Sequence, residues 1–494
     1  MIAEIKAFDG AKWSNGQWTI LDNPRNQYSL RILGGGTHGG YDMPIEPTQA
    51  NRPIYGHQNA ALGFLFTRRR AILAGEMGIG KTLVGIELME TLSGYWWIVA
   101  PKSALIAWEM EFRKWKFTGR PEISSSGGLQ YRLMTYARFT KMVGITKVWP
   151  NHIIFDESHN LKTPTTLRTM AALEMSQLIS GHIVCFTGTP SPRDPSDWWA
   201  QVEICQPGFL REASKSQLAR RLGEFETMEV RGKQFSKLIK WKQDELRLLR
   251  KRLDGMVLSI LKKDCLDLPD KIYIERQCEY TKATENLVLT LKNITGEGIK
   301  LLNRLRQFSD GFEYGSSGTV KRTFHTPKDD LLLEYLLDLE RNRLVVYAAY
   351  HATIDKLVRM AQENKWDVIK LDGRGMYTSK RGLTIEQFQN RTNCIRPTVF
   401  IGHPQAGGQG LTLNASDTII YYSNDFSAVA RPQSEDRIHR IGTTKAVIVD
   451  FYWIPTDRYI RELLRDRRGI AAITTGEINE YLEQSRGTYY QAQG

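Results

Sequence analysis

Short apolar runs recur along most of the chain, and each is bounded by glycine, proline or acidic residues. Within residues 52–200 they are Ala71–Ala74, Trp97–Ala100, Ile153–Phe155 and Ile183–Phe186. Stretches with helical apolar spacing separate them. Continuous apolar runs are typical of strands buried on both faces, and their alternation with helices indicates βαβ units around a parallel sheet. We therefore predict an α/β lobe in this part of the chain.

A second series of the same kind begins near residue 328. It predicts a helix over 328–341, a helix ending near 364, and strands at 344–347, 368–371, 398–401, 418–421 and 447–449. The chain of 494 residues is too long for one core. The predicted fold class is therefore α/β, with two tandem lobes built on parallel sheets.

Three stretches differ from this pattern. Residues 211–263 are heavily charged and helical by pattern, with few strand signals, which predicts a helical insert. Residues 1–50 hold aromatic residues in short alternating stretches, followed by glycines at 34–36 and 39–40, which predicts a small strand-rich module with a flexible exit. The predicted domains are an accessory module at 1–50, a first lobe at 51–270 with its insert from about 211, a second lobe with a helical insert at 271–455, and a C-terminal helix and polar tail at 456–494.

The charge balance indicates a polyanionic partner. Lys and Arg number 67 and Asp and Glu 54, a net charge of +13 with a pI near 9.3. Neutralising phosphates releases condensed counterions, so a basic surplus favours nucleic acid. No apolar run approaches the roughly 18 residues of a membrane span, and the N-terminus lacks an apolar signal core. The five cysteines show neither zinc spacing nor a disulfide framework, so we expect free thiols in a reducing cytosol.

A glycine-rich loop follows the first predicted strand. Gly75-Glu-Met-Gly78-Ile-Gly80-Lys81-Thr82 fits G-x-x-x-x-G-K-[ST], and a predicted helix through Leu92 follows it. Backbone N–H groups of such a loop cradle phosphate oxygens, its lysine reaches the β- and γ-phosphates, and its threonine ligates Mg²⁺. We predict an ATP site with Mg²⁺ here, with Gly78, Gly80, Lys81 and Thr82 as binding residues.

An acidic pair ends a later predicted strand, at Asp156 and Glu157. At this distance from the phosphate loop, Asp156 suits a contact to Mg²⁺, and Glu157 suits polarising the attacking water. His159 follows two residues later; it is either a relay towards the second lobe or a capping or core histidine.

Taken together, these motifs resemble those of superfamily-two helicases, and within them the Swi/Snf-like branch of DNA translocases. Asp156–His159 resembles the D-E-x-H box of that superfamily. The other matching segments are Arg52–Gln58, Ala100–Ser103, Trp108–Trp115, Phe186–Pro190, Leu371–Gly373, Ala406–Leu413 and Gln433–Gly442. The His-Arg-Ile-Gly ending and Leu261–Pro269 between the lobes resemble this branch specifically. The resemblance covers about residues 52–455.

The resemblance implies a role for several further residues. Two RecA-like lobes would hold ATP between them, with Gln58 reading adenine and with Arg437 and Arg440 as arginine fingers. His159, Thr187, Thr189 and Gln433 would couple the nucleotide to the track. Lys102, Thr135, Gln409 and Thr412 are the candidates for contacts to the DNA backbone; for Thr135, Gln409 and Thr412, a turn or capping role remains equally open.

Some positions depart from the pattern of the branch. Thr443 stands where the family commonly has Gln, and Asp425–Ser427 stands where it often has Trp-Asn-Pro. No chromatin-reading domain is visible, which argues against nucleosome remodelling. Residues 8–19 resemble a small module of fork-remodelling, strand-annealing members; a structural appendage pinned by Trp13 and Trp18 is the alternative.

The sequence thus predicts a DNA-dependent ATPase that moves along double-stranded or branched DNA. We expect it to act as a monomer, and we expect no membrane among its partners. We expect it in the cytoplasm of a bacterium or of the host cell of a virus, or in the nucleus if the source is a eukaryote. A strand-separating DNA or RNA helicase is the main alternative. A metabolic P-loop kinase would not need two lobes with a finger motif, and a non-catalytic DNA-binding module would not need the hydrolytic residues.

Overall fold

The computed structural model divides the chain into two compact units, Met1–Leu266 and Asp267–Gly494, called lobe 1 and lobe 2 below. The division falls four residues before the boundary expected at 270. The residues that the structure describes are 12–14, 17–19, 50–121, 128–188, 194–230, 233–296, 298–315, 318–338, 340–380, 383–390, 396–405, 411–427 and 430–466.

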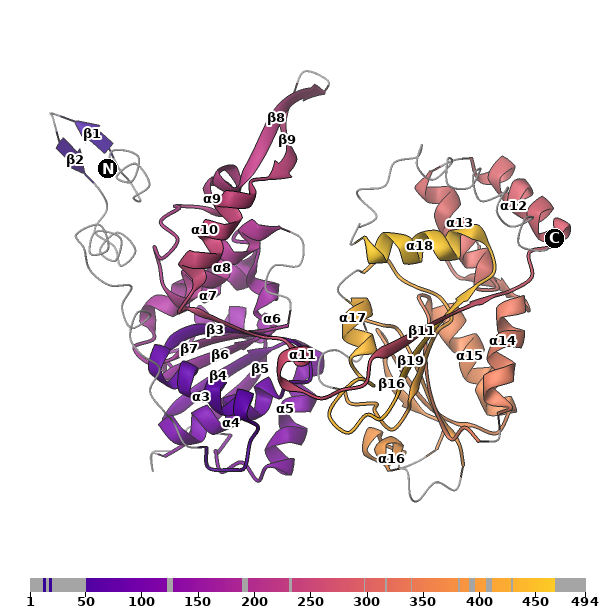
Figure 1. Cartoon of the computed structure of the whole chain (residues 1–494), viewed down its shortest axis with the longest axis horizontal. Helices are drawn as coiled ribbons and strands as arrows, with labels where there is room; N and C mark the ends of the chain where they lie inside the picture. Colours follow the sequence, from indigo (N-terminus) through magenta and orange to yellow (C-terminus); the bar gives the residue numbers. More distant parts are fainter. Residues whose placement is uncertain are drawn as a thin grey trace. The chain divides into compact units, whose positions relative to one another are not determined.

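Lobe 1 is built on a parallel sheet of six strands in the order β10-β3-β7-β6-β4-β5 (Figure 1). The strands are β3 (Arg70–Gly75), β4 (Tyr95–Ala100), β5 (Gln130–Thr135), β6 (His152–Asp156), β7 (Ile183–Thr187) and β10 (Val257–Ile260). All four runs that the hydrophobic pattern marked in residues 52–200 are strands of this sheet. The prediction of a parallel α/β lobe is confirmed.

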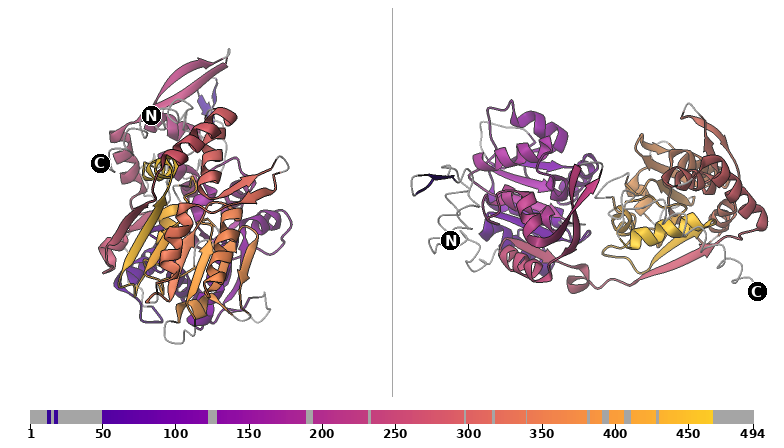
Figure 2. Two further views of the ribbon diagram at one scale, coloured as in Figure 1. Left: turned by 90° about the vertical axis from the view of Figure 1, so that its right-hand side faces the viewer. Right: turned by 90° about the horizontal axis from the view of Figure 1, so that it is seen from above.

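Helices cover both faces of the lobe 1 sheet (Figure 2). One face carries α3 (Gly56–Arg68), α4 (Lys81–Leu92) and α5 (Lys102–Lys114); the other carries α6 (Tyr136–Val143), α7 (Leu167–Leu178) and α8 (Trp198–Cys205). Along β3, Ala71 and Leu73 pack into the first layer, whereas Ile72 packs into the second. Because both faces are buried, every position from Ala71 to Ala74 is apolar.

The stretch 211–263 contains two helices, α9 (Lys215–Leu222) and α10 (Gln243–Leu253), as the pattern predicted. The expectation of few strands was wrong, because an antiparallel hairpin of β8 (Gly223–Val230) and β9 (Lys233–Trp241) lies between them and projects from lobe 1 (Figure 1). Its exposed strands carry charges in facing pairs, such as Glu226 opposite Lys237. Such charges hide the strand signal, because that signal depends on apolar residues.

Lobe 2 has a sheet of seven strands in the order β11-β19-β18-β14-β17-β15-β16, parallel except for β16 at one edge. The strands are β11 (Lys271–Gln277), β14 (Arg343–Tyr347), β15 (Asp367–Asp372), β16 (Gly375–Thr378), β17 (Thr398–Gly402), β18 (Thr418–Tyr421) and β19 (Ala446–Tyr452). The five strands predicted for this lobe are all present. The edge strands β11 and β16 were not predicted; both are largely exposed.

The helices of lobe 2 are α12 (Lys282–Thr295), α13 (Ile299–Ser309), α14 (Pro327–Leu336), α15 (His351–Glu363), α16 (Ile385–Gln389), α17 (Ala430–Glu435) and α18 (Pro455–Arg465). The short strands β12 (Phe312–Tyr314) and β13 (Val320–Thr323) pair between α13 and α14. The helix expected over 328–341 ends earlier, at Leu336, and Arg341 beyond it donates to Thr418 of β18. The insert α12–α13 shares a separate apolar cluster with α18.

Within the stretch predicted as an accessory module, β1 (Lys12–Ser14) and β2 (Gln17–Thr19) form an antiparallel pair in which Trp13 lies opposite Trp18. The glycines at 34–40 and the polar tail after Asp466 lie outside the described residues. No helix in the described part of the chain is long and apolar enough to cross a membrane.

Candidate active site

The glycine-rich loop joins the end of β3 to the start of α4. Gly78 and Gly80 have φ angles of 88° and 87°, in the left-handed region that side chains disfavour. A Cβ atom on Gly80 would also collide with the amide nitrogen of Gln58. The loop therefore requires glycine at 80 for two separate reasons.

The side chain of Lys81 lies across this loop. Its Nζ donates to the carbonyl of Gly75 at 2.6 Å and to that of Glu76 at 3.2 Å. Thr82 is the second residue of α4 and therefore lies in the first turn of the helix. A lysine ammonium, a helix N-terminus and a loop of left-handed glycines form a donor set that fits phosphate oxygens.

Gln58 holds the loop from α3. Its Nε2 donates to the carbonyl of Ile79 at 2.9 Å, and its Oε1 accepts from the backbone N–H of Tyr55 at 3.1 Å. A ring nitrogen of His57 lies 3.0 Å from the same Ile79 carbonyl. The segment expected to read adenine is thus fastened directly to the phosphate loop.

Arg52 anchors that segment to α4. Its guanidinium lies 2.5 Å from a carboxylate oxygen of the buried Glu87 and 2.7 Å from one of Glu90. Although burial acts to raise the pKa of Glu90, the hydrogen bonds from Arg52 and Thr118 bring it below its ordinary value. The pattern of the sequence showed Arg52 as part of a motif but did not show this pairing.

Asp156 ends β6, at the same carboxyl edge of the sheet as the phosphate loop. Its carboxylate accepts from the indole N–H of Trp108 and from the backbone N–H of Glu157, both at 2.9 Å. The hydroxyl of Tyr136 donates to its carbonyl at 2.7 Å. Burial and the charge of Glu157 raise the pKa of Asp156 to about 6, against the bond from Trp108 and the charge of Lys81. Sequence reasoning missed Trp108 and Tyr136 as supports of this carboxylate, because the contacts are made only by folding.

Glu157 has a left-handed backbone, with φ 52° and ψ 52°, and its side chain is almost fully buried. Such a conformation costs a non-glycine residue about 1–2 kcal/mol. Two bonds from Asn160, at 3.0 and 2.9 Å, hold the carbonyl of Glu157 in place. Its carboxylate lies 3.1 Å from Nδ1 of His159. His159 is therefore in close contact with the acidic residue within lobe 1, although neither of these two atoms has a hydrogen-bond partner among the described residues.

The remaining lobe 1 candidates surround this edge. Thr187 is the buried last residue of β7, and a Cβ on the following Gly188 would lie 3.4 Å from the side chain of Met77 in the loop. Thr189 lies outside the described residues. Lys102 is exposed at the start of α5, whereas Thr135 caps α6 by accepting from the backbone N–H of Arg138 at 3.2 Å.

Two candidates of lobe 2, Arg437 and Arg440, follow α17, and Gln433 lies within this helix. Arg437 is buried, and its guanidinium donates to the hydroxyl of Tyr347 at 3.0 Å and to the carbonyl of Pro404 at 3.2 Å. Arg440 is partly exposed and donates to Oγ1 of Thr412 at 2.6 Å. The structure thus brings one predicted finger against one predicted DNA contact. Nε2 of Gln433 is buried without a hydrogen-bond partner among the described residues, and Gln409 lies outside them.

A buried polar network, which the sequence did not indicate, supports α17. Arg431 pairs with Asp450 at 2.7 Å and with Glu435 at 2.7 Å. Asn424 donates to Asp450 at 3.0 Å, and its own carbonyl accepts from Arg306 of α13 at 2.6 Å. The insert helix α13 is thereby linked to the helix that precedes Arg437 and Arg440.

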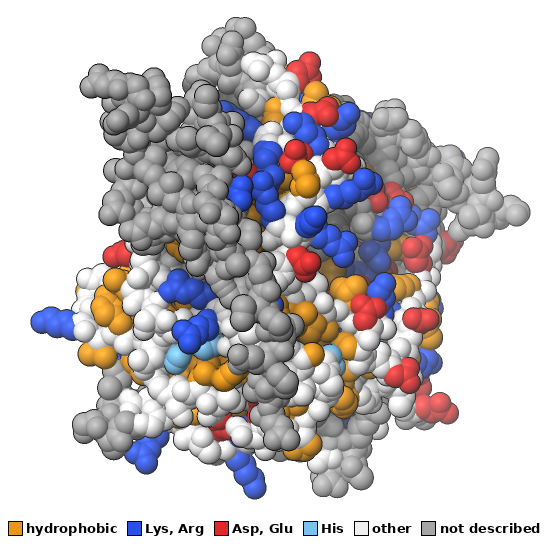
Figure 3. Space-filling view, turned by 60° about the vertical axis from the view of Figure 1, so that its left-hand side comes forward, with side chains coloured by type: hydrophobic (Ala, Val, Ile, Leu, Met, Phe, Trp, Pro, Cys, Tyr) orange, Lys and Arg blue, Asp and Glu red, His pale blue; other side chains and the backbone are white. Residues whose placement is uncertain are grey.

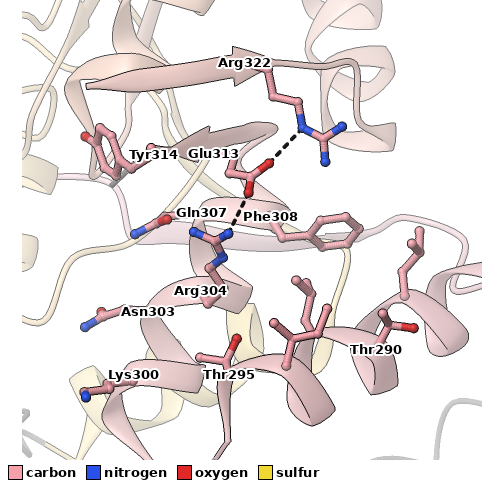
Figure 4. Close-up of a pocket in the computed structure, with 14 residues that line it drawn as sticks. Thr290, Thr295, Lys300, Asn303, Arg304, Gln307, Phe308, Glu313, Tyr314 and Arg322 are labelled. Atoms are coloured by element: carbon pink, nitrogen blue, oxygen red, sulfur yellow. Dashed lines mark hydrogen bonds and ion pairs between the residues drawn. The ribbon is translucent and has the colours of Figure 1, made fainter. Parts of the chain in front are cut away.

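A hollow of about 730 Å³ opens between α12, α13 and the β12–β13 hairpin in lobe 2 (Figure 4). Arg304 and Arg322 converge there on Glu313, at 2.6 and 2.9 Å. None of the residues predicted from the sequence lines it. The phosphate loop and the acidic pair lie instead at the carboxyl edge of the lobe 1 sheet.

A phosphate loop after β3 and an acidic pair after β6, on a parallel sheet followed by a second lobe of similar build, define the class of two-lobed P-loop ATPases. Residues 57–126 and 130–311 match the SNF2-related domain, and residues 327–442 match the helicase conserved C-terminal domain. The chain belongs to the SNF2-related family, and it is an ATP-hydrolysing enzyme of the helicase type.

Similar curated proteins include the CHD3-type chromatin-remodeling factor CHR7 of Arabidopsis thaliana, 26% identical over 90% of this chain and 38% of the relative. Another is the SWI/SNF-related matrix-associated actin-dependent regulator of chromatin subfamily A-like protein 1 of Xenopus tropicalis, 23% identical over 87% of this chain and 46% of the relative. The chain therefore spans less than half the length of these relatives. Among solved structures, it is similar to the Sulfolobus solfataricus SWI2/SNF2 ATPase core in complex with dsDNA, with 21% identity, a TM-score of 0.40, and coverage of 85% of this chain and 92% of that one.

Proposed function

We propose that this protein is an ATP-dependent translocase on double-stranded DNA. The observation that carries the proposal is the juxtaposition at one sheet edge of the loop with Lys81, the buried Asp156 and the strained Glu157, in a chain of the SNF2-related family. The basic charge balance supports a nucleic-acid partner.

The residues divide the chemistry as follows. The loop and Lys81 bind the β- and γ-phosphates, while Thr82 and Asp156 are the residues that would hold Mg²⁺. When bound, the ion neutralises charge on the phosphates. Glu157 orients the attacking water, and His159 holds its carboxylate in place. Arg440, partly exposed, is the better candidate for the finger; Arg437, buried against Tyr347, supports the fold around it.

The ATPase rate tests this function. We expect little hydrolysis without nucleic acid and strong stimulation by duplex DNA, with weaker effects of single-stranded DNA and RNA. A rate that is equally fast with no nucleic acid added would overturn the proposal.

Within this function, we further propose branched DNA as the physiological substrate, with fork regression or junction migration as the outcome. The paired positions of Trp13 and Trp18 support an aromatic module at the N-terminus. Stacking on unpaired bases contributes about 1–3 kcal/mol per base. Deleting residues 1–50 is expected to abolish junction processing and to spare the ATPase rate on plain duplex. Equal losses on both substrates would identify the module as a structural brace.

The projecting β8–β9 hairpin favours a second candidate, a helicase that separates strands. Phe225, Met228 and Ile239 are large apolar side chains exposed on it. Apolar groups on a projecting element are suited to insertion between bases. Two assays distinguish the functions. In a fluorescence-quenching assay on a forked duplex, ATP-dependent release of a single strand indicates strand separation. On a duplex that carries a triplex-forming third strand, ATP-driven displacement of the third strand without unwinding of the duplex indicates translocation.

A further inference from the structure

The basic charge of the chain is concentrated in one part of lobe 1. Residues 211–263 hold 15 Lys and Arg against 7 Asp and Glu, a surplus of 8 within a chain whose total surplus is 13. In Figure 3, Lys and Arg side chains gather on the upper part of the face shown. None of the residues expected to contact the DNA backbone belongs to this segment.

Helix α10 sorts its residues by side. Leu249 and Leu253 are buried in the lobe 1 core, and Leu246 packs against it. Arg247 and Lys251, one turn apart, lie on the opposite side of the helix with the exposed Leu248. Arg250 is also exposed, but it lies nearer the buried leucines and lines a hollow with them. We call the three cations Arg247, Arg250 and Lys251 the α10 basic face.

Two cations of this region, Arg221 of α9 and Arg252 of α10, already have partners. Arg221 lies 2.6 Å from Glu212 and 3.2 Å from Glu245, and Arg252 lies 3.4 Å from Glu212. These pairs fasten the two helices together. The charges of Arg221 and Arg252 therefore have a structural role.

The α10 basic face has no comparable role. Arg247 is 81% exposed and lies 3.2 Å from Asp244, which is itself 91% exposed, a pairing that contributes little to stability. Arg250 and Lys251 form no ion pair with any residue in the described part of the chain. Three cations are therefore presented to the solvent along one helix, spaced over about 6 Å of its axis.

We propose that the α10 basic face binds the phosphate backbone of duplex DNA, as an anchor outside the track formed by the helicase motifs. The inference rests on the proposed function, because it takes duplex DNA as the occupant. Duplex DNA presents one negative charge per about 1.7 Å of its axis, so a short row of cations meets several phosphates. Contacts of this kind hold the duplex without reading its sequence.

The test compares two double variants that lose the same charge. Arg247→Gln with Lys251→Gln removes the face while keeping side-chain length and helix propensity. Arg359→Gln with Arg465→Gln removes two exposed arginines from helices of lobe 2 and serves as the control. Circular dichroism checks that both variants fold. Duplex affinity is measured by fluorescence anisotropy at several salt concentrations, and the ATPase rate is titrated with the same duplex.

For the α10 variant, we expect duplex affinity to fall roughly 3- to 10-fold near 0.1 M salt and the log–log salt slope to become shallower by about 1.8. The DNA concentration for half-maximal ATPase rises by a similar factor, while kcat at saturating DNA stays unchanged. The control remains close to the wild type. The inference is overturned if both variants bind duplex DNA equally well. It is also overturned if the α10 variant keeps its affinity for duplex DNA and loses only its affinity for polyglutamate, an acidic polypeptide measured in the same assay. A wild-type ATPase that duplex DNA does not stimulate would instead refute the proposed function.

Discussion

Two residues of lobe 1 differ in what they contribute to hydrolysis. Lys81→Ala removes a direct phosphate contact, so ATP affinity and turnover should both fall. Glu157→Gln keeps the size of the side chain and the loop untouched, so ATP should still bind while turnover falls by 100-fold or more, about 3 kcal/mol of barrier. Binding of a fluorescent ATP analogue and steady-state hydrolysis measure the two effects. Near-normal hydrolysis by the Glu157 variant would mean that another group orients the water.

Two neighbouring histidines, the buried His182 and the half-buried His152, are expected to make lobe 1 sensitive to acid. Nδ1 of His152 accepts from the backbone N–H of His182 at 2.9 Å, and His152 stacks on Trp96 with ring centres 4.4 Å apart. Burial lowers the pKa of both histidines to about 4. The proximity of His182 lowers the pKa of His152 further, and the charge of Arg69 lowers the pKa of His182 further.

In the unfolded chain a histidine titrates near 6.5, so between pH 6.5 and 4 the unfolded state binds protons that the folded state does not. We expect the stability of lobe 1 to be complete above pH 6.5 and to fall as the pH is lowered to 4. Urea unfolding at a series of pH values measures this. His182→Gln should flatten the dependence, and an unchanged pH slope in that variant would exclude the histidine as its source.

At the scale of elements, α13 acts on α17 through buried polar contacts. Arg306 stacks on the ring of Phe426 at 4.4 Å and holds the carbonyl of Asn424, whose side chain binds Asp450 and Arg431. Because Arg431 lies in α17, a displaced Asn424 would move the segment that carries Arg440.

We expect Arg306→Ala to lower kcat about 10-fold with little change in KM for ATP, and to destabilise lobe 2 by about 1–3 kcal/mol through the unsatisfied carbonyl. Steady-state kinetics and urea unfolding measure the two effects. Arg306→Lys should recover only part of the activity, since an ammonium cannot stack as a guanidinium does. Arg304→Ala, on the same helix, serves as the control. If both alanine variants lower kcat equally, the effect belongs to the insert as a whole.

At the scale of the whole molecule, the net charge of +13 predicts binding that depends steeply on salt. The logarithm of duplex affinity should fall linearly with the logarithm of salt concentration between about 50 and 200 mM, and duplexes of unrelated sequence should bind alike. Fluorescence anisotropy with two such duplexes measures both. A flat plot would show that phosphate contacts do not drive the interaction.

The sequence alone determined the two parallel-sheet lobes and the phosphate loop. Strands buried on both faces leave continuous apolar runs, and a loop that wraps phosphate requires glycines at fixed spacing, so both features are local. The β8–β9 hairpin escaped detection because its exposed strands are charged, and the edge strands β11 and β16 because exposure removes the apolar signal.

Only the tertiary structure decided which residues support the chemistry. Trp108 and Tyr136 reach Asp156 from separate elements, Arg306 reaches Asn424 across 118 positions, and Arg437 is buried although its motif suggests an outward role. Likewise, the cations of α10 are exposed because Leu246, Leu249 and Leu253 occupy the side of the helix that packs into the core. Burial and long-range hydrogen bonds depend on which surfaces meet when the chain folds, and a linear pattern does not contain that information.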